Sequence, residues 1–533
     1  MQPDPPAGGY PTPPIPPTNP TQMSRNLAIA LALCLPWPTL AQKKPADPRP
    51  YAATITEEDL RAHLYTIAGP EMEGRETAME GQRKAAAYIE EQFRNLGLKP
   101  GYNGGFQMPF PVYRDSLAEA RVVVNGKAWG LNTDFQPVMQ FNATATQYFS
   151  EVAFVGHGIV DSSRDDYGAL DVRGRAVLIL DGAPAGYRPA RTGFMSPAGL
   201  YAKIRNAQQR GAAAILLVGA GFPRRAAGAN GNLFTELFKP VQTPNSYIVS
   251  ESLAKAIVGD EWEAVREKAR EGAPAPRTFR TEAQLHFRKE TQFLQSTNVL
   301  GVLEGGDLKN EWLVLTAHYD HLGKRGDVIY YGADDDGSGT VGVIEIAEAF
   351  AKAKAEGKGP RRSILFMAVS GEEKGLWGSE YYTDHPTVPL DSVTANLNID
   401  MIGRIDTERK SADTANYVYV VGDDKLSTDL KPASEAVNAK HTKLTLDYKF
   451  NDPNDTERIY FRSDHYNFAR KGVPIIFYYD GMLKADYHKP TDTPDKIHYP
   501  LLAKRARLVF HTAWEMVNRG AMMKRDLPLP TME

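Results

Sequence analysis

The chain has 533 residues, of which 42% are hydrophobic and 24% charged, a composition typical of a globular protein with about two to four domains. The formal net charge of −3, with no basic run interleaved with aromatic residues, gives no electrostatic basis for binding nucleic acid or an anionic membrane. The single cysteine, Cys34, excludes a disulfide framework and a zinc site of the CxxC type, so any metal must be held by His, Asp and Glu.

The first 41 residues are predicted to lie outside the fold. Residues 1–22 are rich in proline and are expected to be disordered, with translation starting at Met23. Residues 23–41 form a predicted secretory signal peptide, with a basic start, an apolar run from Leu27 to Leu35 and a small-residue exit ending at Ala41. About nine apolar residues are too few for the roughly 20 that a membrane span needs. We therefore expect an exported protein, periplasmic or extracellular, without a stable membrane span.

Residues 42–139 are predicted to form the first part of the main domain. The pattern from Thr56 to Leu98 predicts helix, because Thr56 is a suitable N-cap and apolar residues recur at helical spacing after Gln82. Gly97 is predicted to end this helical stretch.

Residues 140–285 have a different pattern. Short β-type runs dominate, such as those at 176–180 and 214–218, and one helical stretch runs from Leu200 to Arg210. Loops rich in Gly, Pro, Arg and Ala separate these runs. None of the metal-type motifs described below falls here, so this segment is predicted to be a β-rich inserted domain.

Residues 286–533 alternate between predicted strands and helices. The apolar run from Ile364 to Val369 is continuous, which is typical of a strand covered on both faces. The pattern predicts an α/β domain with a mostly parallel central sheet, interrupted by the inserted domain. The predicted strands are 310–317, 363–370, 395–400 and 473–479, and the predicted helices are 340–354 and 501–518.

Metal-binding residue types follow several of these strands directly. His318, the pair Glu372–Glu373 and Asp400 each fall at a strand end, where open α/β sheets collect their ligands. Three adjacent carboxylates, at 334–336, repel one another, and a cation would relieve this repulsion. Imidazole and carboxylate without thiolate suit a catalytic rather than a structural zinc site.

Each of these residues also has an ordinary structural interpretation, as a core histidine, an acidic turn or a solvated loop. Asp320, two residues beyond His318, can accept the second ring N–H of that histidine. Asp492 can orient His488 in the same way. Asp400 after an apolar strand would otherwise be a costly buried charge. The ordered set is therefore far more informative than any single member.

The motifs HxD, ADDDxSG, GEE, an Asp after a strand and a late YHxxxD stand here in order. Together they resemble peptidase family M28, the di-zinc exopeptidases that include bacterial leucyl aminopeptidases and glutamate carboxypeptidases. The resemblance covers about residues 50–136 and 290–520 and implies a three-layer α/β/α fold. The insert resembles a protease-associated (PA) domain through residues 172–179 and 211–216.

The resemblance implies two Zn²⁺ per subunit and a role for each motif residue. Glu372 would be the general base, Tyr487 would donate to the oxyanion, and Arg462 would lie near the substrate. Asp320 and Asp492 would support the ligands from behind, and simple packing is the alternative for Tyr487. His321 and His465 are expected either to support the ligands from behind or to be structural. The implied metal ligands are Asp335 as the bridge, His318 and Asp400 on one ion, and Glu373 and His488 on the other.

The predicted function is that of an exported zinc aminopeptidase acting on peptides with a free N-terminus. The same scaffold also supports carboxypeptidase action or glutaminyl cyclisation, and cyclases keep only one zinc. A receptor-like binding protein on this fold, as in the transferrin receptor ectodomain, is the alternative of another class. Retention of every ligand and of Glu372 favours an enzyme.

Overall fold

The computed structural model describes residues 46–189, 196–224, 230–238, 242–274, 276–411, 413, 415–452 and 455–530, all within one compact unit. The predicted proline-rich extension at 1–22 and signal peptide at 23–41 lie outside the described residues. Within the described ranges, no helix is both long enough and apolar enough to cross a membrane.

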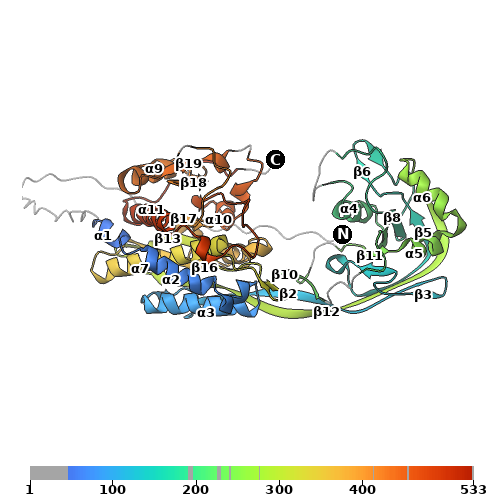
Figure 1. The fold of residues 1–533 in the computed structure, drawn as a ribbon, viewed down its shortest axis with the longest axis horizontal. Coiled ribbons are helices and arrows are strands. Elements are labelled where there is room, and N and C mark those ends of the chain that lie inside the picture. The colour runs from blue at the N-terminus through green and yellow to red at the C-terminus, as the bar shows by residue number, and fades with distance from the viewer. Residues whose placement is uncertain are drawn as a thin grey trace, which may run out of the picture. The chain divides into compact units, whose positions relative to one another are not determined.

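The C-terminal half of the chain is built on a mostly parallel sheet (Figure 1). Its central strands β13, β16, β17 and β20 are mutually parallel, whereas β18 runs antiparallel to β20, and β12 runs antiparallel to β16. This confirms the predicted α/β class. The strands, in spatial order, are β19 (Thr445–Asp447), β18 (Tyr417–Val421), β20 (Ile475–Tyr479), β17 (Val393–Ile399), β13 (Leu308–His318), β16 (Arg362–Val369) and β12 (Arg277–Leu303).

Both faces of this sheet are covered, which explains the continuous apolar runs. Along β16, Ile364 and Phe366 join a core shared with helices α7 (Gly339–Ala355) and α11 (Tyr499–Asn518). Leu365 and Met367 point to the opposite core, which includes residues of α8 (Trp377–Asp384) and α10 (His465–Arg470). Because successive strand residues face opposite sides, this division produces three layers. A further helix, α9 (Leu430–His441), packs beside α11.

The N-terminal helical segment is interrupted rather than continuous. Thr56 caps α2 (Glu57–Ile67) by accepting from the backbone N–H of Asp59 at 3.1 Å, as its residue type predicted. The prediction of one helix from 56 to 98 is wrong, because the chain leaves the helix before Pro70, which lacks a backbone N–H. A 3-10 turn (Pro70–Arg75) separates α2 from α3 (Glu80–Asn95).

Two long antiparallel strands lead into the middle segment of the chain. β2 (Gln107–Val124) pairs with β12 over nearly its whole length, and the first half of β12 also pairs with β5 (Ala145–Phe154). The sheet then continues through shorter strands and is packed against helices α4 (Leu200–Gln209), α5 (Glu251–Val258) and α6 (Trp262–Arg270). Those strands are β8 (Ala176–Leu180), β9 (Ala214–Val218), β11 (Asn245–Val249) and β4 (Phe135–Pro137).

The middle segment has hydrophobic clusters of its own. One cluster draws its buried residues only from positions between Val122 and Phe287, and a second draws them only from positions between Ala153 and Leu217. A short strand of this segment, β10 (Asn230–Phe234), contributes no buried residue to these two clusters. It pairs antiparallel with β2 instead. Through β10 the middle segment therefore contacts β2.

Candidate metal centre

The sheet topology brings the predicted ligands to one edge. His318 is the last residue of β13, Asp400 directly follows β17, and Glu372–Glu373 begin a 3-10 turn (Glu372–Lys374) after β16. Because β16, β13 and β17 are adjacent and parallel, their carboxyl ends meet at the same edge. Residues up to 82 positions apart in the chain therefore share one site.

The acidic turn Ala333–Ser338 leads into α7 and presents one of its three carboxylates, that of Asp335, to the ligand cluster. Asp334 accepts the backbone N–H of Gly403 at 2.8 Å. Asp336 accepts the backbone N–H groups of Met401 and Gly339 at 2.9 and 2.8 Å. Backbone amides thus hold Oδ1 of Asp334 and the carboxylate of Asp336 away from the ligand cluster, although Oδ2 of Asp334 is buried without a hydrogen-bond partner, whereas Asp335 faces that cluster.

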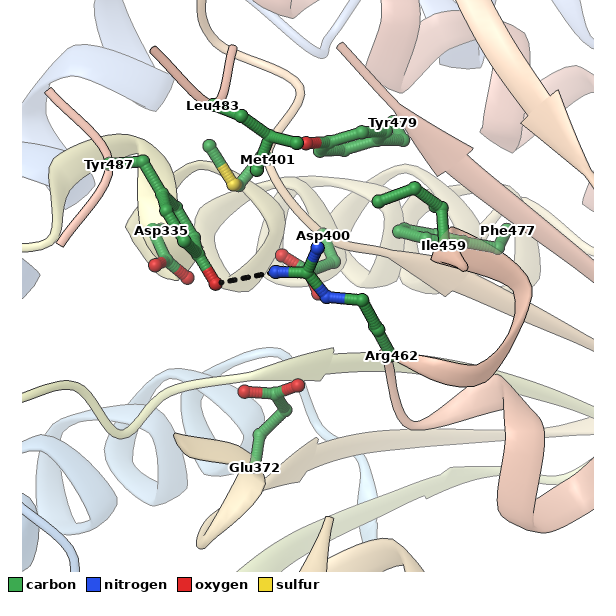
Figure 2. Close-up of a pocket in the computed structure, with 10 residues that line it drawn as sticks. All are labelled: Asp335, Glu372, Asp400, Met401, Ile459, Arg462, Phe477, Tyr479, Leu483 and Tyr487. Atoms are coloured by element: carbon green, nitrogen blue, oxygen red, sulfur yellow. Dashed lines mark hydrogen bonds between the residues drawn. The ribbon is translucent and has the colours of Figure 1, made fainter. Parts of the chain in front are cut away.

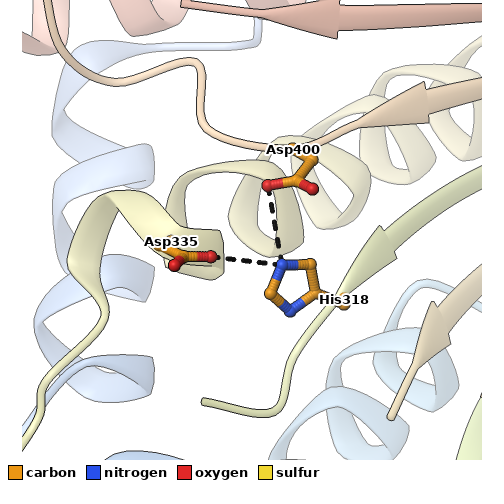
Figure 3. Close-up of side chains that lie close together, drawn as sticks. All are labelled: His318, Asp335 and Asp400. Carbon is orange, nitrogen blue, oxygen red and sulfur yellow. Dashed lines mark ion pairs between the residues drawn. The ribbon is translucent and has the colours of Figure 1, made fainter. Parts of the chain in front are cut away.

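The first ligand group surrounds the imidazole of His318 (Figure 3). Its Nε2 lies 3.3 Å from Oδ1 of Asp335 and 3.5 Å from Oδ1 of Asp400. The other oxygen of Asp400 accepts a hydrogen bond from Ser463 Oγ at 2.7 Å, which fixes the orientation of this carboxylate. His318 is 1% exposed, so the three ligand atoms converge in a space screened from solvent.

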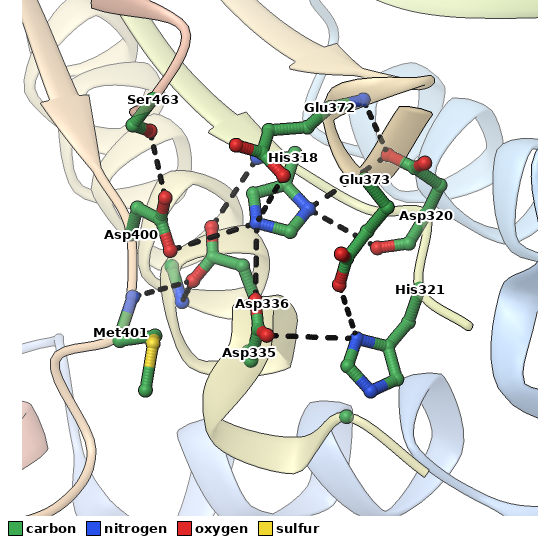
Figure 4. Close-up of polar contacts among 12 residues, drawn as sticks. His318, Asp320, His321, Asp335, Asp336, Glu372, Glu373, Asp400, Met401 and Ser463 are labelled. Carbon is green, nitrogen blue, oxygen red and sulfur yellow. Dashed lines mark hydrogen bonds and ion pairs between the residues drawn. The ribbon is translucent and has the colours of Figure 1, made fainter. Parts of the chain in front are cut away.

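The second ligand group uses the other oxygen of Asp335. Nε2 of His488 lies 3.2 Å from Oδ2 of Asp335 and 3.0 Å from Oε2 of Glu373. Nδ1 of His321 lies 2.8 Å from Oε1 of Glu373 and 3.8 Å from Oδ2 of Asp335 (Figure 4). Asp335 therefore stands between the two groups with one oxygen directed to each.

These residues fit metal cations. Nε2 of His318 and of His488 and Oδ2 of Asp335 are buried atoms without a hydrogen-bond partner among the described residues. Buried polar atoms are normally satisfied, so a cluster of unsatisfied ones signals a missing partner. Imidazole and carboxylate atoms that converge without thiolate are the ligands of catalytic zinc sites.

The electrostatics of the cluster agree with this interpretation. Burial alone would raise the pKa of Asp335, but hydrogen bonds from His318 and His488 hold its pKa well below the ordinary value. Burial opposes the charged form of His488, yet its contacts with Asp335 and Glu373 raise the pKa of this histidine to about 10. Negative charge on the carboxylates therefore attracts positive charge to this point.

Glu372 faces the first ligand group without filling a place in it. Its Oε2 lies 3.8 Å from Nε2 of His318, and its side chain lines an open pocket. Burial, opposed by the nearby His318, raises the pKa of Glu372 well above its ordinary value. A carboxyl group in this setting can both accept and return a proton.

Asp320 supports the site through its backbone and its carboxylate in different ways. Nδ1 of His318 lies 3.1 Å from the carbonyl oxygen of Asp320, whereas the carboxylate oxygen is 3.7 Å away. The carboxylate instead accepts from Thr77 Oγ1 at 2.6 Å and from the backbone N–H of Glu372 at 3.2 Å. The carbonyl thus orients the histidine, and the carboxylate holds the turn that carries Glu372.

Asp492 contacts the backbone of the acidic turn. Its carboxylate accepts the backbone N–H groups of Asp334 and Asp335 at 3.0 and 3.1 Å. The sequence interpretation placed it behind His488, but no hydrogen bond joins these two among the described contacts. Asp492 therefore positions the backbone of Asp334 and Asp335.

Arg462 and Tyr487 lie together in the pocket that opens onto the ligands (Figure 2). Nη2 of Arg462 donates to the hydroxyl of Tyr487 at 3.4 Å. The pocket is small, with a volume of about 30 Å³, and Asp335, Glu372 and Asp400 line its polar side. Its apolar wall is formed by Met401, Ile459, Phe477 and Leu483.

Two residues at the site escaped the sequence interpretation or were assigned only a structural part. His321 is fully buried beside Glu373, and its place in a His-Tyr-Asp-His run was the signal for it. Arg75 is a fully buried arginine whose side chain donates only to backbone carbonyls around the site, and nothing in its local sequence predicts this. Those carbonyls belong to Ile67, Tyr319, Tyr331 and Gly332. His465, expected to be structural, donates from Nε2 to the carbonyl oxygen of Tyr460 at 2.8 Å, and its ring stacks on that of Phe477.

Comparisons with known proteins point to one family. Residues 298–513 match the family model described as Peptidase family M28. The chain is 31% identical over 210 residues to a protein described as "Probable leucine aminopeptidase" of Arthroderma otae, covering 38% of this chain and 54% of that protein. It is 27% identical over 253 residues to Aminopeptidase YwaD of Bacillus subtilis, covering 45% of this chain and 49% of that protein. The chain thus spans about half the length of these curated relatives.

A solved structure shares the fold. The aminopeptidase from Aneurinibacillus sp. strain AM-1 superimposes with a TM-score of 0.52, at 17% sequence identity, over 91% of this chain and 99% of that chain. At this identity the likeness concerns the fold alone.

Proposed function

We propose that the chain is a zinc-dependent aminopeptidase that removes N-terminal residues from peptides, because residues 298–513 match the family model described as Peptidase family M28. The observation that carries the proposal is the placement of Asp335, with one oxygen 3.3 Å from His318 and the other 3.2 Å from His488. A carboxylate shared between two imidazole-bearing ligand groups fits a pair of metal ions, with Glu372 at their side.

We assign one zinc ion to His318, Asp335 and Asp400, and the second to Asp335, Glu373 and His488. Zinc at these positions would supply Lewis acidity to the attacking water and to the scissile carbonyl. Glu373 would bind through the oxygen that faces His488, because its other oxygen lies 2.8 Å from Nδ1 of His321. His321 would thereby hold the ligand carboxylate in place.

Glu372 is proposed as the general base. Its carboxylate would take a proton from the attacking water and pass it to the nitrogen of the leaving amine. The burial that raises the pKa of Glu372 brings it closer to the working range of a group that must both accept and return a proton. The hydrogen bond from its backbone N–H to Asp320 would keep its side chain at the site.

Tyr487 and Arg462 are proposed to stabilise the substrate carbonyl as it gains negative charge. The Tyr487 hydroxyl is oriented by Arg462 at 3.4 Å, and both side chains line the pocket beside the ligands. Preorganised donors of this kind act most strongly where water is excluded. The positive guanidinium also lies where charge would develop.

The substrate's amino end is proposed to bind among the carboxylates. Glu372, Asp400 and Asp335 line one side of the pocket and favour a positively charged ammonium group. The apolar wall, which includes Met401 and Phe477, would take the side chain of the N-terminal residue.

We further propose that residues 140–285 form an inserted, PA-like domain between two parts of the peptidase domain, 42–139 and 286–533. The separate hydrophobic clusters of the middle segment support this division. The proposed signal peptide at 23–41 would direct the protein to the periplasm or the exterior.

Leucine 4-nitroanilide, compared with its N-acetyl form, tests the proposal directly. An aminopeptidase should cleave the free-amine compound and leave the acetylated one nearly untouched, because acetylation removes the ammonium charge. Preference for the acetylated compound would favour carboxypeptidase-like recognition. Cyclisation of an N-terminal glutaminyl peptide in place of hydrolysis would identify a cyclase. Absence of turnover of all these substrates in the presence of zinc would favour a binding protein.

A further inference from the structure

A second pocket lies beside the turn that carries the proposed base. Glu372 lines the first pocket, whereas Lys374, the last residue of the same 3-10 turn, lines the second. The second pocket has a volume of about 360 Å³, within the ~300–1,000 Å³ range usual for small-molecule sites. The turn Glu372–Lys374 therefore contributes one residue to each of the two pockets.

The wall of the second pocket continues into the metal centre. Glu76 lines the pocket, and its backbone forms a bridge with the backbone of His321. The next residue, Thr77, donates its hydroxyl to the carboxylate of Asp320. Both chain segments that border the pocket on this side therefore also support the proposed metal ligands or the base.

The pocket carries an excess of positive charge. Lys374 and Glu76 largely neutralise each other, with Nζ and Oε1 3.2 Å apart. Arg114 is different, because its Nη2 donates to the neutral side chain of Gln292 at 2.9 Å and its buried Nε has no hydrogen-bond partner. No carboxylate pairs with Arg114 among the described residues. An arginine with a free donor is well suited to a carboxylate ligand.

The middle segment of the chain completes this pocket. Strand β10 pairs with β2 so that Leu233 lies opposite Arg114. Leu233 and Trp377 pack against one small apolar cluster that includes Phe110 and Val112. Arg114 shares a strand face with Phe110 and Val112, because successive residues of β2 alternate between faces. Two further β10 residues, Asn230 and Asn232, add polar groups to the rim.

We propose that this pocket binds a carboxylate on the leaving part of the peptide, so that short peptides with a free C-terminus are the preferred substrates. The inference rests on the proposed function, since it places the scissile bond between the two pockets. The N-terminal residue would occupy the first pocket, and the leaving part would pass Lys374 toward Arg114. The middle segment would thus contribute to substrate selection through β10.

Paired substrates test the proposal through kinetics. Leu-Gly and Leu-Gly-Gly are each compared with their C-terminal amides. Leucine 4-nitroanilide carries no carboxylate and therefore measures hydrolysis that does not depend on one. We expect a preference of about tenfold or more in kcat/KM for the free acid in at least one pair. Leu-Asp amide compared with Leu-Asn amide distinguishes a side-chain carboxylate from the terminal one. Cleavage of the anilide with equal rates for acids and amides would overturn this inference and leave the proposed function standing.

Variants test whether Arg114 causes the preference, and a binding measurement tests the preference without turnover. Arg114→Gln should bring the acid-to-amide ratio close to one, and Arg121→Gln, an exposed arginine on the same strand, should leave that ratio unchanged. Calorimetric titration of Leu-Gly and Leu-Gly amide into the Glu372→Gln protein measures the same ratio as dissociation constants. Equal affinities for acid and amide, or equal ratios in Arg114→Gln and wild type, would contradict the proposal even if the protein hydrolysed nothing.

Discussion

The backbone N–H of Glu372 donates a hydrogen bond to Oδ1 of Asp320 at 3.2 Å. This contact joins the end of β13 to the turn after β16, and it ties the proposed base to the residue that orients His318 through its carbonyl. The first prediction follows from it. Asp320→Ala should lower kcat by about 10- to 100-fold, the usual cost of losing a supporting partner in a metal site.

Asp320→Asn serves as the matched variant for this prediction. The amide oxygen can still accept the Glu372 N–H, and the backbone carbonyl toward His318 is kept, so most activity should return. The measurement is kcat with leucine 4-nitroanilide, together with zinc content. Equal kcat for Asp320→Ala and wild type would show that the carboxylate does not support the base.

Tyr487→Phe should lower kcat by about 100-fold with little change in KM, because an oxyanion donor acts in the transition state rather than in the ground state. Tyr479→Phe is the control, since Tyr479 lines the same pocket and its buried hydroxyl has no hydrogen-bond partner among the described residues. Steady-state kinetics on both variants distinguishes oxyanion donation by Tyr487 from simple packing. A similar small effect for both would favour simple packing for Tyr487.

Arg75→Lys should lower the free energy of unfolding by about 2–5 kcal/mol, since lysine cannot serve all the carbonyls that Arg75 binds and each unsatisfied buried group costs about 1–3 kcal/mol. Arg83→Lys is the control, because Arg83 makes an exposed ion pair with Glu80 and should change stability by less than about 0.5 kcal/mol. Urea unfolding of the two variants measures the difference. Equal stability of Arg75→Lys and wild type would show that the hydrogen bonds from Arg75 to these carbonyls do not stabilise the fold.

The stability of the protein should depend on His465 at acidic pH. Burial lowers the pKa of His465 from 6.5 to about 3 in the folded protein, so the unfolded chain binds one more proton between these pH values. Stability is then lost as the pH falls below about 6.5. Between pH 7 and pH 5 this one group should cost about 2 kcal/mol.

His465→Gln should remove that part of the pH dependence, because glutamine can keep a donor for the carbonyl of Tyr460 without titrating. Urea unfolding at pH 7 and pH 5, with a chelator present throughout, compares wild type and variant free of metal effects. An identical loss of stability in both proteins would show that His465 is not held neutral.

The strand-end pattern predicted which side chains meet at the edge of the sheet, whereas contacts between distant segments could not be predicted from it. His318 and Asp400 could be found because parallel strands bring their carboxyl ends together. The role of Asp492 depends on which backbone N–H groups lie beside it after folding, and the sequence spacing alone suggested His488 instead. Arg75 binds carbonyls from segments more than 240 residues away, so no local pattern reveals it.

The long strands β2 and β12 were not predicted from the sequence either, and the reason is physical. β12 contains a run of charged residues at 288–290 that is atypical of a buried strand, and there it is half-exposed or exposed. Its pairing with β2, rather than burial, stabilises this stretch. The contact of β10 with β2, which forms the second pocket, likewise depends on tertiary pairing that alternation of residue types does not encode.

Zinc content measured together with turnover tests the central claim most directly. Chelated protein is titrated with zinc while leucine 4-nitroanilide hydrolysis is followed, and Glu372→Gln is treated in parallel. The account predicts two zinc ions per chain in both proteins, recovery of activity only in wild type, and a loss of about 100-fold or more in the variant. Full activity of the chelated protein, or near-wild-type turnover by Glu372→Gln, would contradict it.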